Sequence, residues 1–389
     1  MKTNHRSLFQ NAKKIKTIKS GSIDLVVTSP PYPMIEMWDD VFSENNPKIR
    51  SALQAENGGL AFELMHKELD AVWKEMVRVL RNGGFACINI GDAVRTIHDN
   101  FMLYPNHSRI LTSFYQKGLS PLPAIIWRKQ TNAPNKFMGS GVLPAGAYVT
   151  LEHEYVLVFR KGGKREFDTE KYRAGRQNSA LFWEERNQWF SDVWMDLKGA
   201  RQDQVDKNIR KRSGAFPFEL PYRLINMYSV KGDTILDPFL GTGTTMFAAM
   251  AACRNSVGVE IDKNFLEIIE AQSGSIVDFS NGHINERLRR HEKFVQDRIQ
   301  LKKTLKHTNR HYGFPVIMNQ EKNLVFDHLT DVRKTGTGRF EVEYLKESAI
   351  NNSQQQAGDA DETKKKDFQQ TNDVDEPVKK NFQQLELKL

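Results

Sequence analysis

Two short segments of the chain combine residue types that could do chemistry, and the first is Thr28-Ser29-Pro30-Pro31-Tyr32. Two successive prolines fix φ and present carbonyl oxygens without a competing amide donor, between a hydroxyl and an aromatic ring. Ser29 and the Pro30 carbonyl could therefore hold the two hydrogens of an NH₂ group while Tyr32 stacks on the ring that bears it. The alternative is a rigid turn without function, because short motifs also occur by chance.

The chemistry of a nucleobase amine explains why such a wall would be useful. The exocyclic nitrogen is a poor nucleophile because its lone pair is delocalised into the ring. Acceptors on both N–H groups would push the nitrogen towards tetrahedral geometry, so that the lone pair can attack a sulfonium methyl group in line. Orientation is then the main catalytic contribution. A base inside a duplex must first be rotated out of the stack.

The second segment, residues 234–245 (TILDPFLGTGTT), predicts a nucleoside-cofactor loop. A buried strand ends at Asp237, crosses a glycine turn and opens a helix, and the glycines let a ligand approach the backbone. There is no lysine for a phosphate, whereas an acid suits the amino group of S-adenosylmethionine. The next strand ends at Glu260, where a carboxylate can accept both hydroxyls of a ribose. The alternative is that Asp237 merely caps a helix and Glu260 merely ends a strand.

Strands and helices alternate along the chain and must position both segments. Apolar residues at helical spacing lie between two β-branched runs and stop at residues 82–84, a signal for a helix end. The predicted strands are 23–28, 85–90, 124–128, 155–159, 234–237 and 256–260, and the predicted helices are 110–117, 219–228, 244–253 and one from 264. This order predicts an α/β fold with one doubly wound, mostly parallel sheet.

The composition limits the class of protein. A formal charge of +8 and a pI near 9.2 suit a polyanionic partner. We expect a cytoplasmic protein without a membrane segment, because no apolar run is long enough to span a bilayer or to form a secretion signal. Cys87 and Cys253 lie in apolar stretches without ligands at metal spacing, so they are predicted core residues and no metal is expected.

Changes in residue pattern divide the chain into five predicted regions. Periodicity is lost after residue 161, where scattered lysines and arginines accompany Trp183, Trp189 and Trp194. The last residues are polar and too poor in apolar side chains to fold. The regions are a catalytic half (1–161), an inserted recognition region (162–212), a cofactor-binding half (213–275), a basic C-terminal appendage (276–347) and a disordered tail (348–389).

TSPPY and DPFLGTGTT together resemble the bacterial DNA amino-methyltransferases, which make N4-methylcytosine or N6-methyladenine. The catalytic motif precedes the cofactor loop, as in the permuted β group of that family. The resemblance implies a seven-stranded Rossmann-like sheet, target recognition by residues 162–212, a late antiparallel strand at 154–159 and a methionine pocket lined by residues 215–221. It implies catalysis by Ser29, Pro30, Pro31 and Tyr32, and cofactor binding by Phe216, Pro217, Asp237, Pro238, Phe239, Gly241, Gly243, Thr244, Glu260 and Asp262.

The sequence departs from the family pattern at two places. Many relatives carry an acid near the start that contacts the adenine of the cofactor, whereas residues 4–9 offer only Asn4 or Ser7. The catalytic motif begins with Ser29 instead of aspartate, which in the family is usually associated with cytosine N4. Cytosine is therefore ranked first and adenine second, and RNA-directed or non-catalytic proteins of the same fold are further alternatives.

The expected partner is double-stranded DNA, with a separate restriction endonuclease as the family's common companion. The apolar loop 33–40 could wedge into the base stack or simply pack beneath a lid. Recognition sequence and oligomeric state do not follow from the sequence. The cations expected to contact phosphates are Lys161, Lys164, Arg165, Arg210, Lys211, Arg212, Arg287, Arg289, Arg290, Lys302 and Lys303.

Overall fold

The computed structural model describes residues 1–129, 138–197 and 216–346. The predicted tail and the end of the predicted recognition region, from residue 198, lie outside the described residues. Met1–Glu347 cluster as one compact unit. No helix among the described residues is long and apolar enough to cross a membrane.

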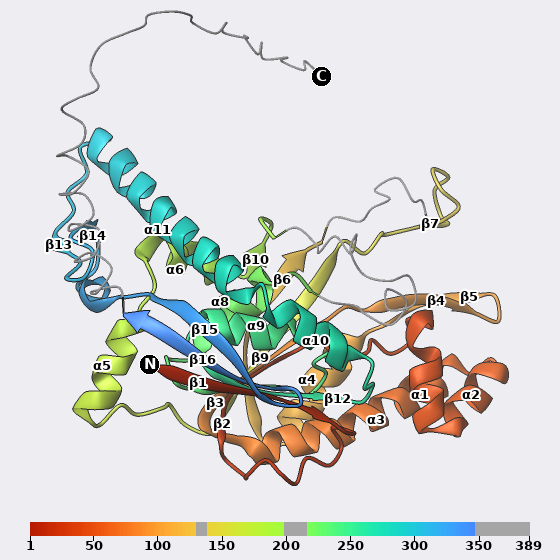
Figure 1. Cartoon of the computed structure of the whole chain (residues 1–389). Helices are drawn as coiled ribbons and strands as arrows, with labels where there is room; N and C mark the ends of the chain where they lie inside the picture. The colour runs from red at the N-terminus through yellow and green to blue at the C-terminus, as the bar shows by residue number, and fades with distance from the viewer. Residues whose placement is uncertain (130–137, 198–215, 347–389) are drawn as a thin grey trace, which may run out of the picture. The chain divides into compact units, whose positions relative to one another are not determined.

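A single large sheet organises this unit (Figure 1). Its strand order is β10-β6-β9-β3-β2-β11-β12-β1-β16-β15. The strands are β1 (Lys2–Phe9), β2 (Ile23–Thr28), β3 (Leu80–Ile90), β6 (Leu119–Arg128), β9 (His153–Lys161), β10 (Val193–Trp194), β11 (Thr234–Asp237), β12 (Asn255–Glu260), β15 (Asp327–Gly336) and β16 (Arg339–Lys346).

The seven strands from β6 to β1 form the predicted methyltransferase sheet. Only β9 is antiparallel among them, which confirms the predicted late antiparallel strand. The described sheet extends beyond these seven strands, because β10 adds to one edge and β16 and β15 add to the other. The predicted C-terminal appendage therefore continues the sheet.

Helices cover both faces of the sheet, as a doubly wound fold requires. Alternate residues of β2 face opposite cores: Val26 packs with α3, while Leu25 and Val27 pack with α8 and α9. The helices are α1 (Asp39–Asn45), α2 (Pro47–Gln54), α3 (Gly58–Val79), α4 (Asn106–Gln116), α5 (Glu170–Asn178), α6 (Trp183–Trp189), α8 (Glu219–Tyr228), α9 (Thr244–Ala251), α10 (Phe265–Ser273) and α11 (Ile276–Gln300).

Most predicted elements occur where the pattern placed them, but the end of α3 differs. The helix stops at Val79, and residues 80–84 already belong to β3. Gly83 has a φ of +77°, so the glycine signal marks an irregularity within the strand and not the helix end. Cys87 and Cys253 are buried free thiols, which confirms the prediction of core residues.

The predicted recognition region begins at the edge of the sheet opposite to the ends of β2 and β11. Arg165 forms a two-point ion pair with Asp233 (2.5 and 2.9 Å), just before β11. Lys161 donates to the carbonyls of Val77 (2.6 Å) and Leu80 (2.7 Å). Arg165 and Lys161 are therefore structural cations, contrary to the prediction that they contact phosphates.

The tryptophans of this region also differ from expectation. Trp189 and Trp194 are buried in the core beside α8, and β10 pairs with β6. Arg287 on α11 is buried against Glu185 on α6, with nitrogen–oxygen distances of 2.6 and 2.7 Å. Residues 183–194 thus carry regular, packed structure, which the absence of periodicity did not predict. Arg287 is likewise engaged inside the fold and is not free to bind DNA.

Candidate active site

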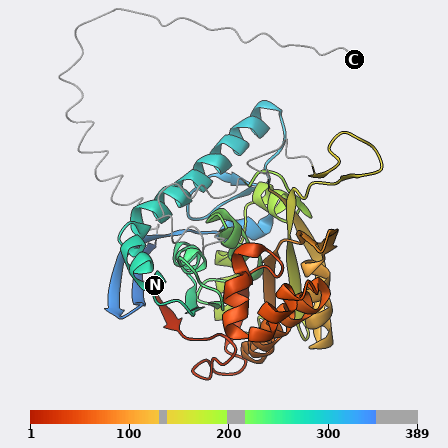
Figure 2. The same ribbon diagram turned by 90° about the vertical axis from the view of Figure 1, so that its right-hand side faces the viewer.

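The two segments predicted to form the active site, residues 28–32 and 234–245, meet at one edge of the sheet. β2 and β11 are parallel neighbours, with Leu25 opposite Ile235 and Val26 opposite Leu236, so their carboxyl ends lie side by side. This edge faces right in Figure 1, and Figure 2 views the molecule from that side. Ligands of open α/β sheets bind at this edge.

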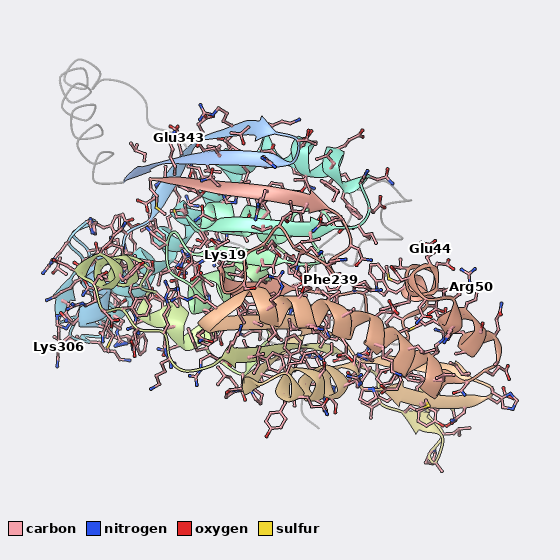
Figure 3. The ribbon with its side chains drawn as sticks, turned by 90° about the horizontal axis from the view of Figure 1, so that it is seen from below. Lys19, Glu44, Arg50, Phe239, Lys306 and Glu343 are labelled. Atoms are coloured by element: carbon pink, nitrogen blue, oxygen red, sulfur yellow. The ribbon has the colours of Figure 1, made fainter. Side chains whose placement is uncertain are left out.

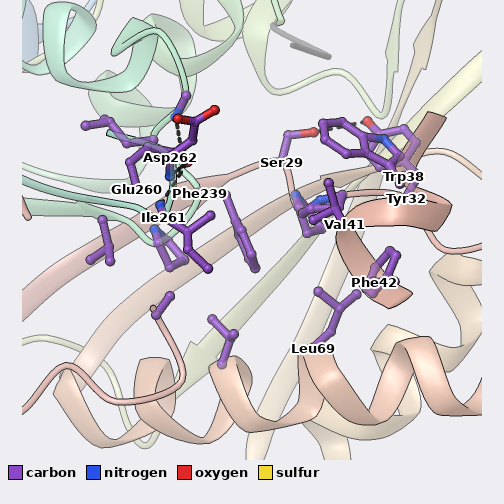
Figure 4. A pocket seen from close by; sticks show the side chains of 18 of the residues that line it. Ser29, Tyr32, Trp38, Val41, Phe42, Leu69, Phe239, Glu260, Ile261 and Asp262 are labelled. Atoms are coloured by element: carbon purple, nitrogen blue, oxygen red, sulfur yellow. Dashed lines mark hydrogen bonds between the residues drawn. The ribbon is translucent and has the colours of Figure 1, made fainter. Parts of the chain in front are cut away.

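A cavity of about 1080 Å³ opens at this edge. Its two sides face each other in Figure 4, with Ser29 and Tyr32 on one side and Glu260 and Asp262 on the other. The predicted residues that line it are Ser29, Pro30, Pro31, Tyr32, Phe216, Asp237, Pro238, Phe239, Gly241, Thr244, Glu260 and Asp262. Pro217 and Gly243 were also predicted to contact the cofactor, but they are not among its lining residues.

The cofactor loop is shaped by glycines and by close packing. Gly243 precedes α9 with a φ of +91°, and Gly241 has a φ of +53° with nothing within 4 Å of an added Cβ. A Cβ at Gly258 would lie 2.3 Å from the Leu240 side chain, so a glycine there lets the loop pack on β12. The ring of Phe239 packs edge-on against Trp73 of α3, and Figure 3 shows Phe239 beside that helix.

Asp237 joins the predicted cofactor loop to the end of β2. Its Oδ1 accepts hydrogen bonds from Thr28 Oγ1 (2.6 Å) and the Phe239 amide (3.0 Å), and its Oδ2 accepts one from Thr245 Oγ1 (2.6 Å). Burial raises the pKa of Asp237 from 3.8 to about 6, although these hydrogen bonds oppose the change. The predicted contact with an amino group therefore stays a prediction, because both oxygens already have partners.

Glu260 ends β12 at the rim of the same cavity. Its Oε2 accepts a hydrogen bond from the Gly241 amide (2.8 Å), and its Oε1 accepts two from the amides of Ile261 (2.8 Å) and Asp262 (2.9 Å). Burial raises the pKa of Glu260 above its usual value. A carboxylate has about four acceptor positions. The expected grip on both ribose hydroxyls thus requires some rearrangement and stays a prediction.

Part of the cavity is lined by residues that the sequence did not single out. Asn4 and Ser7, the candidates from the family pattern, do not line the cavity, whereas Gln10 and Asn11 after β1 do. The Nε2 atom of Gln10 is buried without a hydrogen-bond partner. An adenine ring offers acceptor nitrogens for such a donor, so the residues present fit the adenosyl group.

The predicted catalytic segment, Ser29–Tyr32, leaves β2 directly after Thr28. Ser29 Oγ lies 3.1 Å from Tyr32 Oη, and Tyr32 is half-buried. The backbone of Met34 takes a φ of +67°, and its side chain is buried while Met37 is 43% exposed. The loop 33–40 therefore packs in part and exposes apolar surface in part, so both interpretations of the loop stay open.

Three polar residues close to this segment were missed as functional candidates. Asn89 lies one residue before the end of β3, Glu154 is the second residue of β9 and Lys129 follows β6, and all three lie near Tyr32 or in the cavity lining. Asn89 is 2% exposed inside the apolar run FACINI. A buried polar residue at the carboxyl end of a strand was the available signal.

Comparison with known proteins decides the family. The N6/N4 DNA methylase family model matches residues 23–271. The chain belongs to this family. It is 52% identical to the type II methyltransferase M.MthZI of Methanothermobacter thermautotrophicus over 88% of this chain and 96% of that one. It is 48% identical to the type II methyltransferase M.MjaI of Methanocaldococcus jannaschii, over 70% and 92%.

A solved structure agrees with this methylase fold. The protein TTHA0409 of Thermus thermophilus, named as a putative DNA modification methylase, was crystallised with S-adenosyl-L-methionine. It is 30% identical, covers 69% of this chain and 92% of its own length, and superposes with a TM-score of 0.53. The predicted doubly wound methyltransferase fold is thereby confirmed.

Proposed function

We propose that this DNA methylase transfers a methyl group to the exocyclic N4 of a flipped-out cytosine in double-stranded DNA. The observation that carries the proposal is that Ser29–Tyr32 and the loop after β11 line the same cavity. The cofactor is S-adenosyl-L-methionine, which supplies a methyl group already activated on a sulfonium.

The chain's own residues hold and orient the amine. Ser29 Oγ and the Pro30 carbonyl accept its two hydrogens, and the ring of Tyr32 stacks on the base. The assignment to cytosine rests on serine at position 29, where relatives specific for adenine usually have aspartate. A hydroxyl and a carboxylate can both accept from an amine, so pocket size and contacts to the ring edge must complete the discrimination.

The proposed DNA-facing surface is the carboxyl edge of the sheet. Two hairpins project there, β4 (Ala93–Ile97) with β5 (Asn100–Tyr104) and β7 (Met138–Gly139) with β8 (Ala147–Tyr148) (Figure 1). Phe101 and Tyr148 stack with ring centroids 4.5 Å apart and so join the hairpins. Within the described part of the predicted recognition region, α5 lies on the opposite side from these hairpins in Figure 1.

The biological setting proposed is protection of DNA from a separate endonuclease that reads the same sequence, since two close relatives are named type II methyltransferases. A plasmid methylated by this protein should resist some members of a panel of restriction enzymes. Resistance to none of them would remove the support for this setting without affecting the proposed reaction.

Nucleoside mass spectrometry tests the base assignment. DNA of varied sequence is incubated with the protein and S-adenosyl-L-methionine, digested to nucleosides and compared with DNA treated with Ser29→Ala protein. The proposal predicts N4-methylcytosine that depends on Ser29. N6-methyladenine as the only product would refute the base assignment, and the absence of any modified nucleoside in DNA would refute the proposed function.

A further inference from the structure

The side chains of Asn89, Glu154 and Lys129 come from separate parts of the chain and form a connected group beside Ser29 and Tyr32. Tyr32 Oη lies 2.9 Å from Glu154 Oε2 and 3.1 Å from Ser29 Oγ. Asn89 Nδ2 lies 2.7 Å from Glu154 Oε2 and 2.9 Å from Tyr32 Oη. Lys129 Nζ lies 2.9 Å from Glu154 Oε1, and the Glu154 side chain is only 12% exposed. A carboxylate therefore stands directly behind the tyrosine of the motif.

The direction of each hydrogen bond follows from what each group can donate. An ionised Glu154 can only accept, so the hydroxyl proton of Tyr32 points to it. The Asn89 amide also donates towards both of these oxygens. The oxygen of Tyr32 is then an acceptor for the hydroxyl of Ser29. The pKa of Tyr32 is raised well above its usual value, first by burial and then by the charge of Glu154, so the phenol stays protonated.

A serine hydroxyl alone could either donate or accept, and only acceptance helps an amine to react. With its proton directed to Tyr32, Ser29 presents its lone pairs to the cavity. We propose that Glu154 acts through Tyr32 as a positioning residue, holding Ser29 as an acceptor and receiving the proton that methylation releases. This inference rests on the proposed function, because it requires an exocyclic amine against Ser29.

The proposed step balances without a further reagent. The amine nitrogen gives its lone pair to the methyl carbon, and the carbon–sulfur bond breaks with its electron pair left on sulfur. The nitrogen then carries one proton too many. Ser29 Oγ takes this proton while passing its own to Tyr32 Oη, and Tyr32 passes its own to Glu154 Oε2. The product amine is then neutral, and Ser29 and Tyr32 each carry one proton, as before the reaction. Glu154 alone is changed: it is protonated and must lose the proton to water.

Two nearly isosteric substitutions test the relay. Tyr32→Phe keeps the stacking ring and removes the hydroxyl, and Glu154→Gln keeps the shape but cannot accept the proton. We expect each to lower kcat by about 100-fold, the lower end of the range for a single proton-transfer group, with little change in affinity for cofactor or DNA. The double variant should be at most about twofold slower than the worse single variant, because residues that act as a unit are not additive.

Glu152→Gln is the matched control, because Glu152 lies two residues away and pairs with Arg128 at 3.3 Å. It should retain the kcat of the parent protein. Thermal unfolding of all variants checks that they fold. If Glu154→Gln does not fold, Tyr32→Phe alone tests the relay.

Two results would overturn the inference. One is full activity of Tyr32→Phe, and the other is a double variant whose loss is the product of the two single losses. Failure of the base assignment is seen separately, in the product nucleoside. If Tyr32→Phe makes N4-methylcytosine at the normal rate, only the relay is rejected. If the product is N6-methyladenine but the effects of Tyr32→Phe and Glu154→Gln on kcat are not additive, only the assignment to cytosine is rejected.

Discussion

The two sides of the active-site cavity are held in place by different means. On the cofactor side, Glu260 is fixed by three backbone amides of Gly241, Ile261 and Asp262, all within 19 residues in the sequence. On the base side, Tyr32 is fixed by side chains of Asn89 and Glu154, which lie 57 and 122 residues away. Glu260, on the proposed cofactor side, is thus held by contacts that are near in the sequence, whereas Tyr32, on the proposed base side, is held by contacts between distant strands.

The difference indicates which substitutions should be specific. Changes on the proposed cofactor side should alter cofactor affinity, because they change the loop after β11 and the end of β12. Changes on the base side should alter turnover, because they change side chains that meet only after the sheet has formed. Asp237 is the exception that joins the two sides through Thr28 and Thr245.

The largest effect is expected from Asp237→Ala. This change removes the acceptor of three hydrogen bonds and the proposed partner of the cofactor's amino group. We expect binding of S-adenosyl-L-methionine to fall by more than about 100-fold, which is about 3 kcal/mol, while the protein stays folded. Isothermal titration calorimetry measures the affinity, and thermal unfolding checks the fold. Unchanged affinity in both Asp237→Ala and Glu260→Ala would reject the loop as the cofactor site.

A smaller effect on the other side of the cavity is expected from Tyr32→Ala. Loss of a base–aromatic stack costs about 1 to 3 kcal/mol, so capture of the flipped base should weaken by roughly 10- to 100-fold. Turnover should fall as well, whereas cofactor affinity should stay close to that of the parent. Fluorescence of a 2-aminopurine placed at the target position follows base capture. A loss of cofactor affinity instead would contradict the separation of the two sides.

The pH dependence of stability tests Asp237, the buried residue that connects the two sides of the cavity. The folded-state pKa of Asp237, about 6, lies above the value of 3.8 expected in the unfolded chain. Folding therefore disfavours the ionised form of Asp237. The resulting loss in the free energy of unfolding grows as pH rises from about 4 to about 6, and above that it is complete at roughly 3 kcal/mol. Asp237→Asn should gain stability relative to the parent at pH 7.5 more than at pH 4.5. Urea unfolding at both values gives this difference, and an equal difference at both would contradict the buried charge.

The smallest effects are expected on α11, away from both sides of the cavity. Arg289 and Arg290 are exposed and pair only with Glu286 in the described structure, at 2.8 and 3.1 Å. If they contact phosphates, each alanine substitution should lower the slope of log affinity for DNA against log salt by at most about 0.9. Cofactor affinity should not change with either substitution. Truncation after residue 347 should leave the slope unaltered, and a large loss of DNA binding on truncation would contradict this placement.

The contrast between the two sides also explains what could be predicted from the sequence. The strand, glycine turn and helix around Asp237 are contiguous, and the second acid follows on the next strand, so their register is visible in the chain. TSPPY was equally visible. Asn89, Glu154 and Lys129 were not, because their proximity to Tyr32 depends on the pairing of β3, β9 and β6.

The appended regions were harder to predict for a related reason. Residues 183–194 carry short elements whose apolar side chains, such as Trp189 and Trp194, are buried by long-range packing against α8 and β6. Short elements give little periodicity, so the sequence suggested a loose insertion. Cationic residues misled in the same way, since charge alone does not separate a DNA contact from Arg165 or Arg287 in an internal ion pair.

The most direct test of the account compares Ser29→Ala with Glu260→Ala in the same assay of methyl transfer to duplex DNA. At saturating cofactor, Ser29→Ala should lower kcat by about 100-fold with cofactor affinity retained, because its contact strengthens only as the nitrogen becomes tetrahedral. Glu260→Ala should weaken cofactor affinity and keep most of its kcat once the cofactor saturates. The reverse pattern, or loss of both quantities in both variants, would contradict the claim that one side of the cavity orients the base and the other binds the cofactor.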